Sequence, residues 1–190
     1  GGLGLSATAE VKNTKINITD DYSSGIAAIS VAGDGGNGGN AGGIVSSGGK
    51  GNIAGQAGAV SVNTDNTTSI MINGKNSNGI VAQSVAGAGG RGGNSVGLGS
   101  LGGKGGVGGN ANTSTVTNQA DIKITGDESN AILAQSLGGG GGNGGKVVGV
   151  ASLGATGGAG GDGSSVTVIN NGSLSIEGQS SYGMLAQSIG

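Results

Sequence analysis

Apolar and polar residues alternate along this chain in short runs that recur at regular intervals. The clearest run places two large aliphatic residues one polar residue apart, as in Lys15-Ile-Asn-Ile-Thr19. A period of two puts both aliphatic side chains on one face of an extended segment, so the pattern predicts a half-buried strand. A shorter run of the same kind precedes it after a polar turn. The expected strands are residues 15–19, 69–73, 121–125 and 173–177, and before them the segments around Val11 and at 60–62, 114–117 and 166–168.

A third run carries the motif Gly-Ile-x-Ala-Gln-Ser or a close variant of it. One face of this run is apolar or small, as in Ile80, Ala82 and Ser84, and the other is apolar or amide-bearing, as in Val81 and Gln83. A strand without a solvent-like face is normally covered on both sides. We therefore expect one face to line a core and the other to lie beneath the glycine-rich segment that follows. The motif occupies residues 25–30, 79–84, 131–136 and 183–188.

The three runs recur together as one unit. Ile16, Ile70, Ile122 and Leu174 occupy equivalent positions and are separated by 54, 52 and 52 residues. Such fidelity is typical of stacked, structurally equivalent units. We divide the chain into a single array of about three and a half units, and we expect this array to belong to a longer chain. The units are residues 1–43, 44–93, 94–145 and 146–190.

No part of the pattern predicts a helix, because no window sustains the three-and-four apolar spacing of a helical stripe. Three short strands joined by polar turns, without hairpin signals, predict an all-β parallel solenoid, or β-helix, in which each strand pairs with its own copies. We expect one coil per unit; if the glycine-rich segment formed a second coil, the spacing between copies would double. The expected ladder residues are Ile70, Ile122 and Leu174 in the core, and Gln83, Gln135 and Gln187 on the opposite face of the third strand.

Glycine supplies 50 of the 190 residues, and most of it lies in two blocks between the third run of one unit and the first run of the next. Within a block, a Gly-Gly pair is followed by a variable residue, as in Gly102-Gly-Lys-Gly-Gly-Val-Gly-Gly-Asn110. A period of three is that of a polyproline-II-type helix, which makes no internal hydrogen bonds. The blocks are therefore expected to form either polyglycine-II packing, with bare backbone edges side by side, or flexible loops.

The absence of several residue types excludes many common kinds of functional site. The chain has no Cys, His, Trp, Phe or Pro, and its net charge is −2. Zinc, haem, thiol and Ser-His-Asp sites therefore lack their usual residues. There is no basic surplus and no aromatic platform for nucleic acid. No apolar run is long enough to span a membrane.

Two acidic patterns bear on possible functional sites. Residues 157–164 match a calcium-binding nonapeptide until its large apolar position, which is Ser164, and Asp162 has no acidic counterpart in the other units. The pairs Asp20-Asp21 and Asp127-Glu128 lie in expected turns, where we interpret them as solvated residues. Because no acidic position recurs in all units, we expect no catalytic, cofactor or metal site, and no enzyme activity.

The third run and the glycines after it resemble a known family. Residues 131–145, Ala-Ile-Leu-Ala-Gln-Ser-Leu-Gly-Gly-Gly-Gly-Gly-Asn-Gly-Gly, together with residues 79–84 and 183–190, are similar to the glycine-rich passenger repeats of bacterial autotransporter adhesins, which are type V secreted proteins. The first unit departs from the motif, with Ile29 in place of Gln and Asp34 inside its glycine block. The resemblance implies a right-handed β-helical passenger at the cell surface, anchored in the outer membrane through a region outside these residues.

These patterns lead us to expect a structural stalk, the passenger segment of a secreted or surface-exposed bacterial adhesin, outside the cell. Its expected partners are like repeats in the same or neighbouring chains, associating end to end or laterally, and a host or surface receptor of unspecified identity. The alternative is a subunit of an extracellular filament or matrix, assembled by packing glycine-rich β repeats between chains.

Overall fold

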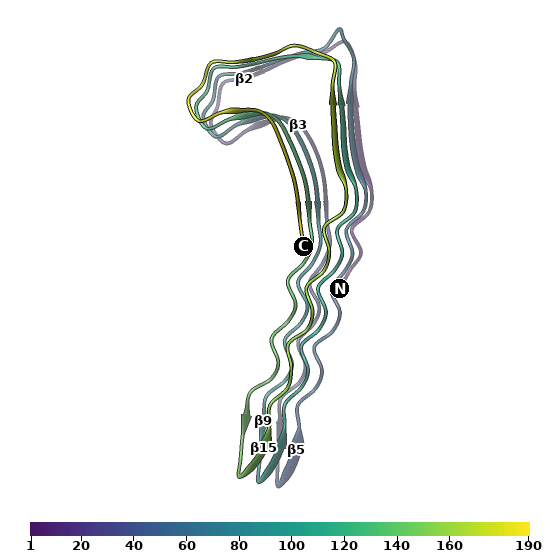
Figure 1. Ribbon diagram of the computed structural model, residues 1–190, viewed down its shortest axis with the longest axis vertical. Helices are drawn as coiled ribbons and strands as arrows, with labels where there is room; N and C mark the ends of the chain where they lie inside the picture. Colours follow the sequence, from purple (N-terminus) through teal and green to yellow (C-terminus); the bar gives the residue numbers. More distant parts are fainter.

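The computed structural model describes the whole chain, residues 1–190, as β-strands and connecting segments without a helix. Each unit follows the same path (Figure 1). Three strands turn around a broad region, which we call the head. The chain then runs out along a narrow glycine-rich arm, reverses at a tip with two short strands, and runs back along the arm to the head of the next unit. Copies of the unit lie side by side, and this confirms the expected all-β stack of parallel strands.

Five ladders of parallel strands join the units, three in the head and two at the tip. The first head ladder contains β1 (Ala7–Val11), β6 (Val60–Thr64), β11 (Ser114–Asn118) and β16 (Val166–Asn170). The second contains β2 (Lys15–Ile18), β7 (Ser69–Ile72), β12 (Asp121–Ile124) and β17 (Leu174–Ile176). The third contains β3 (Ser24–Val31), β8 (Asn78–Val85), β13 (Asn130–Leu137) and β18 (Tyr182–Ile189).

The two tip ladders have three short strands each. One contains β4 (Ala41–Gly42), β9 (Ser95–Val96) and β14 (Val147–Val148). The other contains β5 (Val45–Ser47), β10 (Gly99–Leu101) and β15 (Ala151–Leu153). These strands were not predicted from the sequence; they lie between the two glycine blocks of each unit.

The difference in unit length is confined to one corner of the head. The connection between the first two strands has three residues in the first unit (12–14), four in the second (65–68) and two in the third (119–120). Every other connection keeps its length from unit to unit. Equivalent residues after this corner are therefore offset by 54 and then by 52 positions, as in the pairs Ile16–Ile70 and Ile70–Ile122.

The inner faces of the three head ladders pack into one apolar core. Ile70, Ile80, Ile122 and Ile132 are buried there, because strands of both neighbouring units cover them. Equivalent residues of the first and last units, such as Leu174, are only partly buried. Burial therefore depends on neighbouring units, as expected for a repeat that cannot enclose a core alone.

Two glycine-rich legs form the arm in each complete unit. The outbound leg joins the third head strand to the tip (residues 32–40, 86–94 and 138–146), and the return leg joins the tip to the next head strand (residues 48–59, 102–113 and 154–165). Each leg repeats a cycle of three residues: one donates its N–H to the facing leg, one donates to the next unit, and one is exposed to solvent. In one return leg, Gly106 N–H donates to Gly90 C=O of the facing leg at 2.8 Å, and Gly105 N–H donates to Thr156 C=O of the next unit at 3.0 Å. The third residue, Lys104, is exposed to solvent.

The facing-leg bonds recur every three residues and bring the two legs too close for side chains between them. A Cβ atom on Gly106 would lie 1.9 Å from the carbonyl oxygen of Asn52, the equivalent residue in the return leg of the preceding unit, and one on Gly105 would lie 2.0 Å from the carbonyl oxygen of Gly142 in a facing leg. Glycine is therefore required by the distance between the legs, which explains its period of three. The donors of the facing-leg bonds are Gly33, Gly49, Asn52, Gly55, Gly87, Gly90, Gly93, Gly103, Gly106, Gly109, Gly139, Gly142, Gly145, Gly158 and Gly161.

The expected cover over the outer face of the third strand is wrong. The glycine-rich legs bond to each other and extend away from the head, so they do not pack outside that face (Figure 1). On the outer face of β3, in the first unit, Ile29 and Val31 keep 47% and 64% of their surface exposed, whereas Val81 of the flanked second unit is buried with 5% exposed. The physical reason is that the inner backbone edges of the two legs satisfy one another, which a side-chain-bearing strand surface would not do.

Candidate functional site

The aliphatic residues that the sequence placed in one ladder are direct neighbours in the head. Ile122 pairs with Ile70 on one side and with Leu174 on the other, in parallel register. All three side chains belong to the apolar core or pack against it. They join units by burial of aliphatic surface and present no group that reacts or binds a polar ligand.

The three glutamines form a second ladder on the outer face of the third strand. Gln83 Nε2 donates to Gln135 Oε1 at 2.5 Å, and Gln135 Nε2 donates to Gln187 Oε1 at the same distance. Ile29 holds the equivalent position in the first unit and ends the ladder. These amides bond to one another and not to glycine backbone, so their role in the structure is to link successive units.

The serine of the same motif fastens the arm to the head. Gly58 N–H donates to Ser30 Oγ at 2.8 Å, and Ser84 Oγ donates to Gly58 C=O at 3.0 Å. Asn112 N–H then donates to Ser84 Oγ at 2.8 Å. Each serine thus ties the end of the third strand to the return leg that approaches it. Sequence reasoning placed this serine on the inner face but missed its partner; its recurrence on an otherwise apolar face was the available signal.

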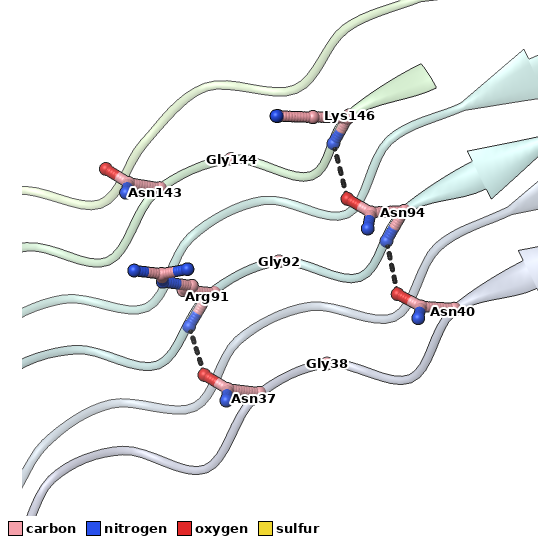
Figure 2. Close-up of a pocket in the computed structure, with 9 residues that line it drawn as sticks. All are labelled: Asn37, Gly38, Asn40, Arg91, Gly92, Asn94, Asn143, Gly144 and Lys146. Atoms are coloured by element: carbon pink, nitrogen blue, oxygen red, sulfur yellow. Dashed lines mark hydrogen bonds between the residues drawn. The ribbon is translucent and has the colours of Figure 1, made fainter. Parts of the chain in front are cut away.

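Outward Asn and Asp side chains perform a second linking role that the sequence did not reveal. Asn37 Oδ1 accepts the N–H of Arg91, and Asn40 Oδ1 accepts the N–H of Asn94, both at 2.8 Å. Asn94 Oδ1 in turn accepts the N–H of Lys146, also at 2.8 Å (Figure 2). In each case the acceptor and the donor hold the same position in successive units. The acceptors of this kind are Asp21, Asp34, Asn37, Asn40, Asn94, Asn110, Asp121 and Asp127.

These side chains line a groove of about 410 Å³ along the outbound legs, with no hydrophobic residue in its lining. The side chains of Arg91 and Lys146 lie in it beside the amides of Asn37, Asn94 and Asn143 (Figure 2). The groove offers hydrogen-bond donors and positive charge but contains no nucleophile, carboxylate pair or general base. Its chemistry is that of polar binding.

The longest head corner is held by Asp65. Its carboxylate accepts hydrogen bonds from the hydroxyls of Thr68 and Thr67, at 2.6 and 2.8 Å, and from the N–H of Asn13. The hydrogen bond from Thr68, followed by those from Thr67 and Asn13, lowers the pKa of Asp65 to about 2. These bonds stabilise the charged carboxylate, so Asp65 acts as a local turn cap.

A polar ladder fills the same corner in the following units. Thr64 Oγ1 donates to Asn118 Oδ1, and Asn118 Nδ2 donates to Asn170 Oδ1, both at 2.7 Å. Asn118 is fully buried, and its Nδ2 also donates to Ala120 C=O. A buried amide with these partners is satisfied and serves the corner itself.

The paired acids of the turns also bind neighbouring backbone. Asp21 accepts the N–H of Lys75 at 2.8 Å, and Asp127 accepts the N–H of Gln179 at 3.0 Å. The bond from Gln179, aided by the nearby Lys75, lowers the pKa of Asp127. The interpretation of these acids as solvated turn residues therefore needs correction, since one member of each pair links two units. No cluster of three acidic residues that would hold a metal ion occurs in the structure.

Polarity is inverted at the tip of the arm. Ser95 and Ser100 lie inside with 0% and 5% of their surface exposed, and Ser100 Oγ donates to the carbonyl groups of Gly97 and Val148. The aliphatic residues next to these inner positions and in the turns point outward, whereas Val147, which pairs with Ser95, is half-buried. This exposed set contains Ile44, Val45, Val96, Leu98, Leu101, Val148, Val150 and Leu153.

Comparisons with known proteins add no relative: no family model, curated protein or solved structure matches this chain. None of its segments is a long apolar helix of the kind that crosses a bilayer.

Proposed function

We propose that this chain is a structural stalk, the passenger segment of a secreted or surface-exposed bacterial adhesin, and that it carries out no catalysis. The observation that supports this proposal is the continuity of hydrogen bonding between units. Main-chain bonds join each unit to the next in the head, the arm and the tip. In a stack of this kind each unit contacts only its neighbours, so length grows with the number of units while the cross-section stays constant.

The proposal includes one coil per unit and polyglycine-II packing of the legs. Two findings support it. Equivalent strands of successive units pair directly, without an intervening strand. The leg amides bond to the facing leg or to the next unit, in the period of three that this packing requires.

A filament or matrix subunit is the second candidate function. Met184 holds the same core position as Ile132, yet it keeps 52% of its surface exposed, whereas Ile132 is fully buried. The uncovered core edge at the last unit would accept the first unit of a second chain, since both expose the edges of the same ladders.

Solution size distinguishes the two functions. Residues 94–145 form one repeat, so a chain with three additional copies should lengthen along the stacking direction by about 14 Å. For a stalk, light scattering should show only limited end-to-end association through the exposed edges, and small-angle scattering should show the added length. A mass that rises steeply with concentration would favour the filament. A chain that stays unfolded, or gains no length, would contradict both functions.

Surface location needs a separate experiment. Antibodies raised against residues 1–190 should label intact producing cells, and external protease should remove the label. Labelling that appears only after permeabilisation would contradict the surface proposal without affecting the stacked architecture.

A further inference from the structure

The exposed aliphatic side chains at the tip are not a consequence of missing neighbours. Val96, Leu98 and Leu101 belong to the middle of the three tips, which has a neighbouring tip on each side, and they still expose 54%, 62% and 46% of their surface. The apex position is aliphatic in every unit that reaches the tip: it is Ile44, then Leu98, then Val150. Contiguous exposed apolar surface of this kind usually marks an interaction site.

The interior of the tip does not need these side chains. Buried hydroxyls fill it: Ser46 Oγ and Ser95 Oγ lie 2.6 Å apart, and Ser100 Oγ bonds to two carbonyl groups. The turn is therefore held by serine and main chain. The aliphatic residues contribute little to the stability of the turn. We therefore interpret their outward position as a surface that contacts a partner.

Positive charge surrounds the apolar tip. Lys146 directly precedes β14, while Lys50 and Lys104 follow β5 and β10 by three residues. At about 3.1 Å per residue, these lysines lie within about 10 Å of the tip strands, which is about one Debye length at about 0.1 M salt. Lys50 and Lys104 also share a groove of about 240 Å³ with Leu101 and Leu153. We call Lys50, Lys104 and Lys146 the basic collar.

The acidic residues of the arm lie at its other end. Asp34 is close to β3, and Asp162 is close to β16. The tip thus combines an aliphatic apex with positive charge alone. A second copy of the tip would bring two basic collars together, and like charges oppose that contact.

We infer that the tip is a docking site for an anionic lipid bilayer. The apex side chains Ile44, Leu98 and Val150 enter the headgroup region, and the basic collar lies against the lipid phosphates. Apolar insertion and attraction to anionic lipid add together in binding of this kind. Because successive units carry the same apex, each added unit extends the contact along the stack. The inference goes beyond the stalk function and does not depend on where the chain is displayed.

Vesicle flotation of the purified 190-residue chain tests this inference. The chain should float with vesicles of equal parts phosphatidylcholine and phosphatidylglycerol, and weakly or not at all with phosphatidylcholine alone. Replacing the basic collar (Lys50→Gln, Lys104→Gln, Lys146→Gln) should lower partitioning into anionic vesicles by roughly a hundredfold, since each lysine near such a surface contributes about fivefold. High salt should have a similar effect on the unmodified chain.

The apex variant separates insertion from simple charge attraction. Ile44→Ser, Leu98→Ser and Val150→Ser together should abolish flotation. The matched control replaces equally aliphatic, exposed residues away from the tip, Ile53→Ser, Val107→Ser and Ile169→Ser, and should float as the unmodified chain does. Circular dichroism should show that both variants keep the same β structure.

A labelled chain provides a second measurement that needs no loss of binding. The protein has no Cys, so Leu98→Cys accepts a single environment-sensitive fluorophore, and Ile29→Cys on the head is the control. Anionic vesicles should shift the emission to the blue at position 98 and leave position 29 unchanged.

Failure of flotation with both vesicle types would overturn the inference and favour an acidic protein partner. Equal loss in the apex and control variants, or an unchanged spectrum at position 98, would also overturn it. Dimers that disappear in the apex variant while vesicles stay unbound would assign the tip to self-association. None of these results affects the length and mass measurements that test the stalk.

Discussion

Alanine at Gly142 would test directly whether the arm is held by contact between bare backbones. Gly142 is buried between the two legs; its N–H donates to Gly106 C=O and its C=O accepts the N–H of Gly158, both at 2.8 Å. A Cβ atom on this residue would lie 2.0 Å from the carbonyl oxygen of Gly90, and real Cβ contacts essentially never fall under 3.0 Å. Gly90 is the equivalent residue in the outbound leg of the preceding unit, so these two outbound legs would have to separate locally by about 1 Å or more. Gly142 would then also move away from its partners on the return legs.

That separation would weaken both hydrogen bonds of Gly142 beyond useful geometry. Each buried polar group left without a partner costs about 1–3 kcal/mol, so Gly142→Ala should lower the free energy of unfolding by about 2–6 kcal/mol. Urea denaturation followed by far-UV circular dichroism measures this change.

Gly140→Ala is the matched control, two residues earlier in the same leg. Gly140 is exposed, has no atom within 4 Å of an added Cβ, and does not adopt positive φ. The substitution should therefore raise the free energy of unfolding by about 0.4–1 kcal/mol, because alanine restricts the unfolded chain. If the two variants agree within about 0.5 kcal/mol, the arm is not held by close backbone packing.

Three further predictions concern the head. Ile132→Asp should lower the free energy of unfolding by several kcal/mol, because Ile132 is fully buried, whereas Ile132→Val should cost about 1 kcal/mol; urea titration compares them, and equal costs would contradict the core position. Glu128 has φ of 54°, which costs a non-glycine residue about 1–2 kcal/mol. Glu128→Gly should therefore raise the thermal midpoint, and an unchanged midpoint would show that this corner is unstrained. Because the pKa of Asp65 is lowered to about 2 in the folded chain, its contribution is present above the ordinary carboxyl pKa and is lost as pH falls through about 2. Asp65→Asn should flatten the fall in stability between about pH 4 and 2, and an unaltered pH profile would refute the capping role.

The strands of the head could be predicted because alternation and repetition act together there. Ile16-Asn-Ile18 and its copies put apolar side chains on one face in every unit, and a unit of this size has no other way to bury them than by stacking. The pairing of Ile70 with Ile122 follows from that requirement alone, without knowledge of the chain's path elsewhere.

The course of the glycine-rich legs could not be predicted in the same way. A period of three indicates which residues lack side chains, but it does not indicate which surface they approach. The outer face of the third strand, with Val81 and Gln83, was a plausible surface to cover, and the facing leg was another. The main-chain amides favour the facing leg, because Gly90 N–H and Gly106 N–H each donate to a carbonyl group there.

The tip was missed for a related reason. Alternation identifies an apolar face but assumes that this face points inward. At Ser95-Val96 and Ser100-Leu101 the serines are inside, because they bond to the turn carbonyls, and the aliphatic side chains are outside. No local pattern distinguishes this arrangement from an ordinary strand. The linking role of the outward Asn and Asp acceptors could not be predicted either, because such residues are common in any solvent-exposed turn.

The arm has a consequence for how such sequences diverge over time. In the legs flanked by other units on both sides, two residues of every three are held by contacts that admit only the smallest side chains, whereas the third lies in solvent, as Lys104 and Val107 do. Neutral substitutions should therefore accumulate almost entirely at the solvent-exposed position, one residue in three. Insertions should shift the register of both legs unless they add whole triplets to each leg. The corner before β7 is free of this restriction, as its varied length shows. Related sequences should accordingly differ by single-residue insertions at that corner and by insertions of whole triplets in the arm. Charged substitutions should fall at the solvent-exposed positions of the legs.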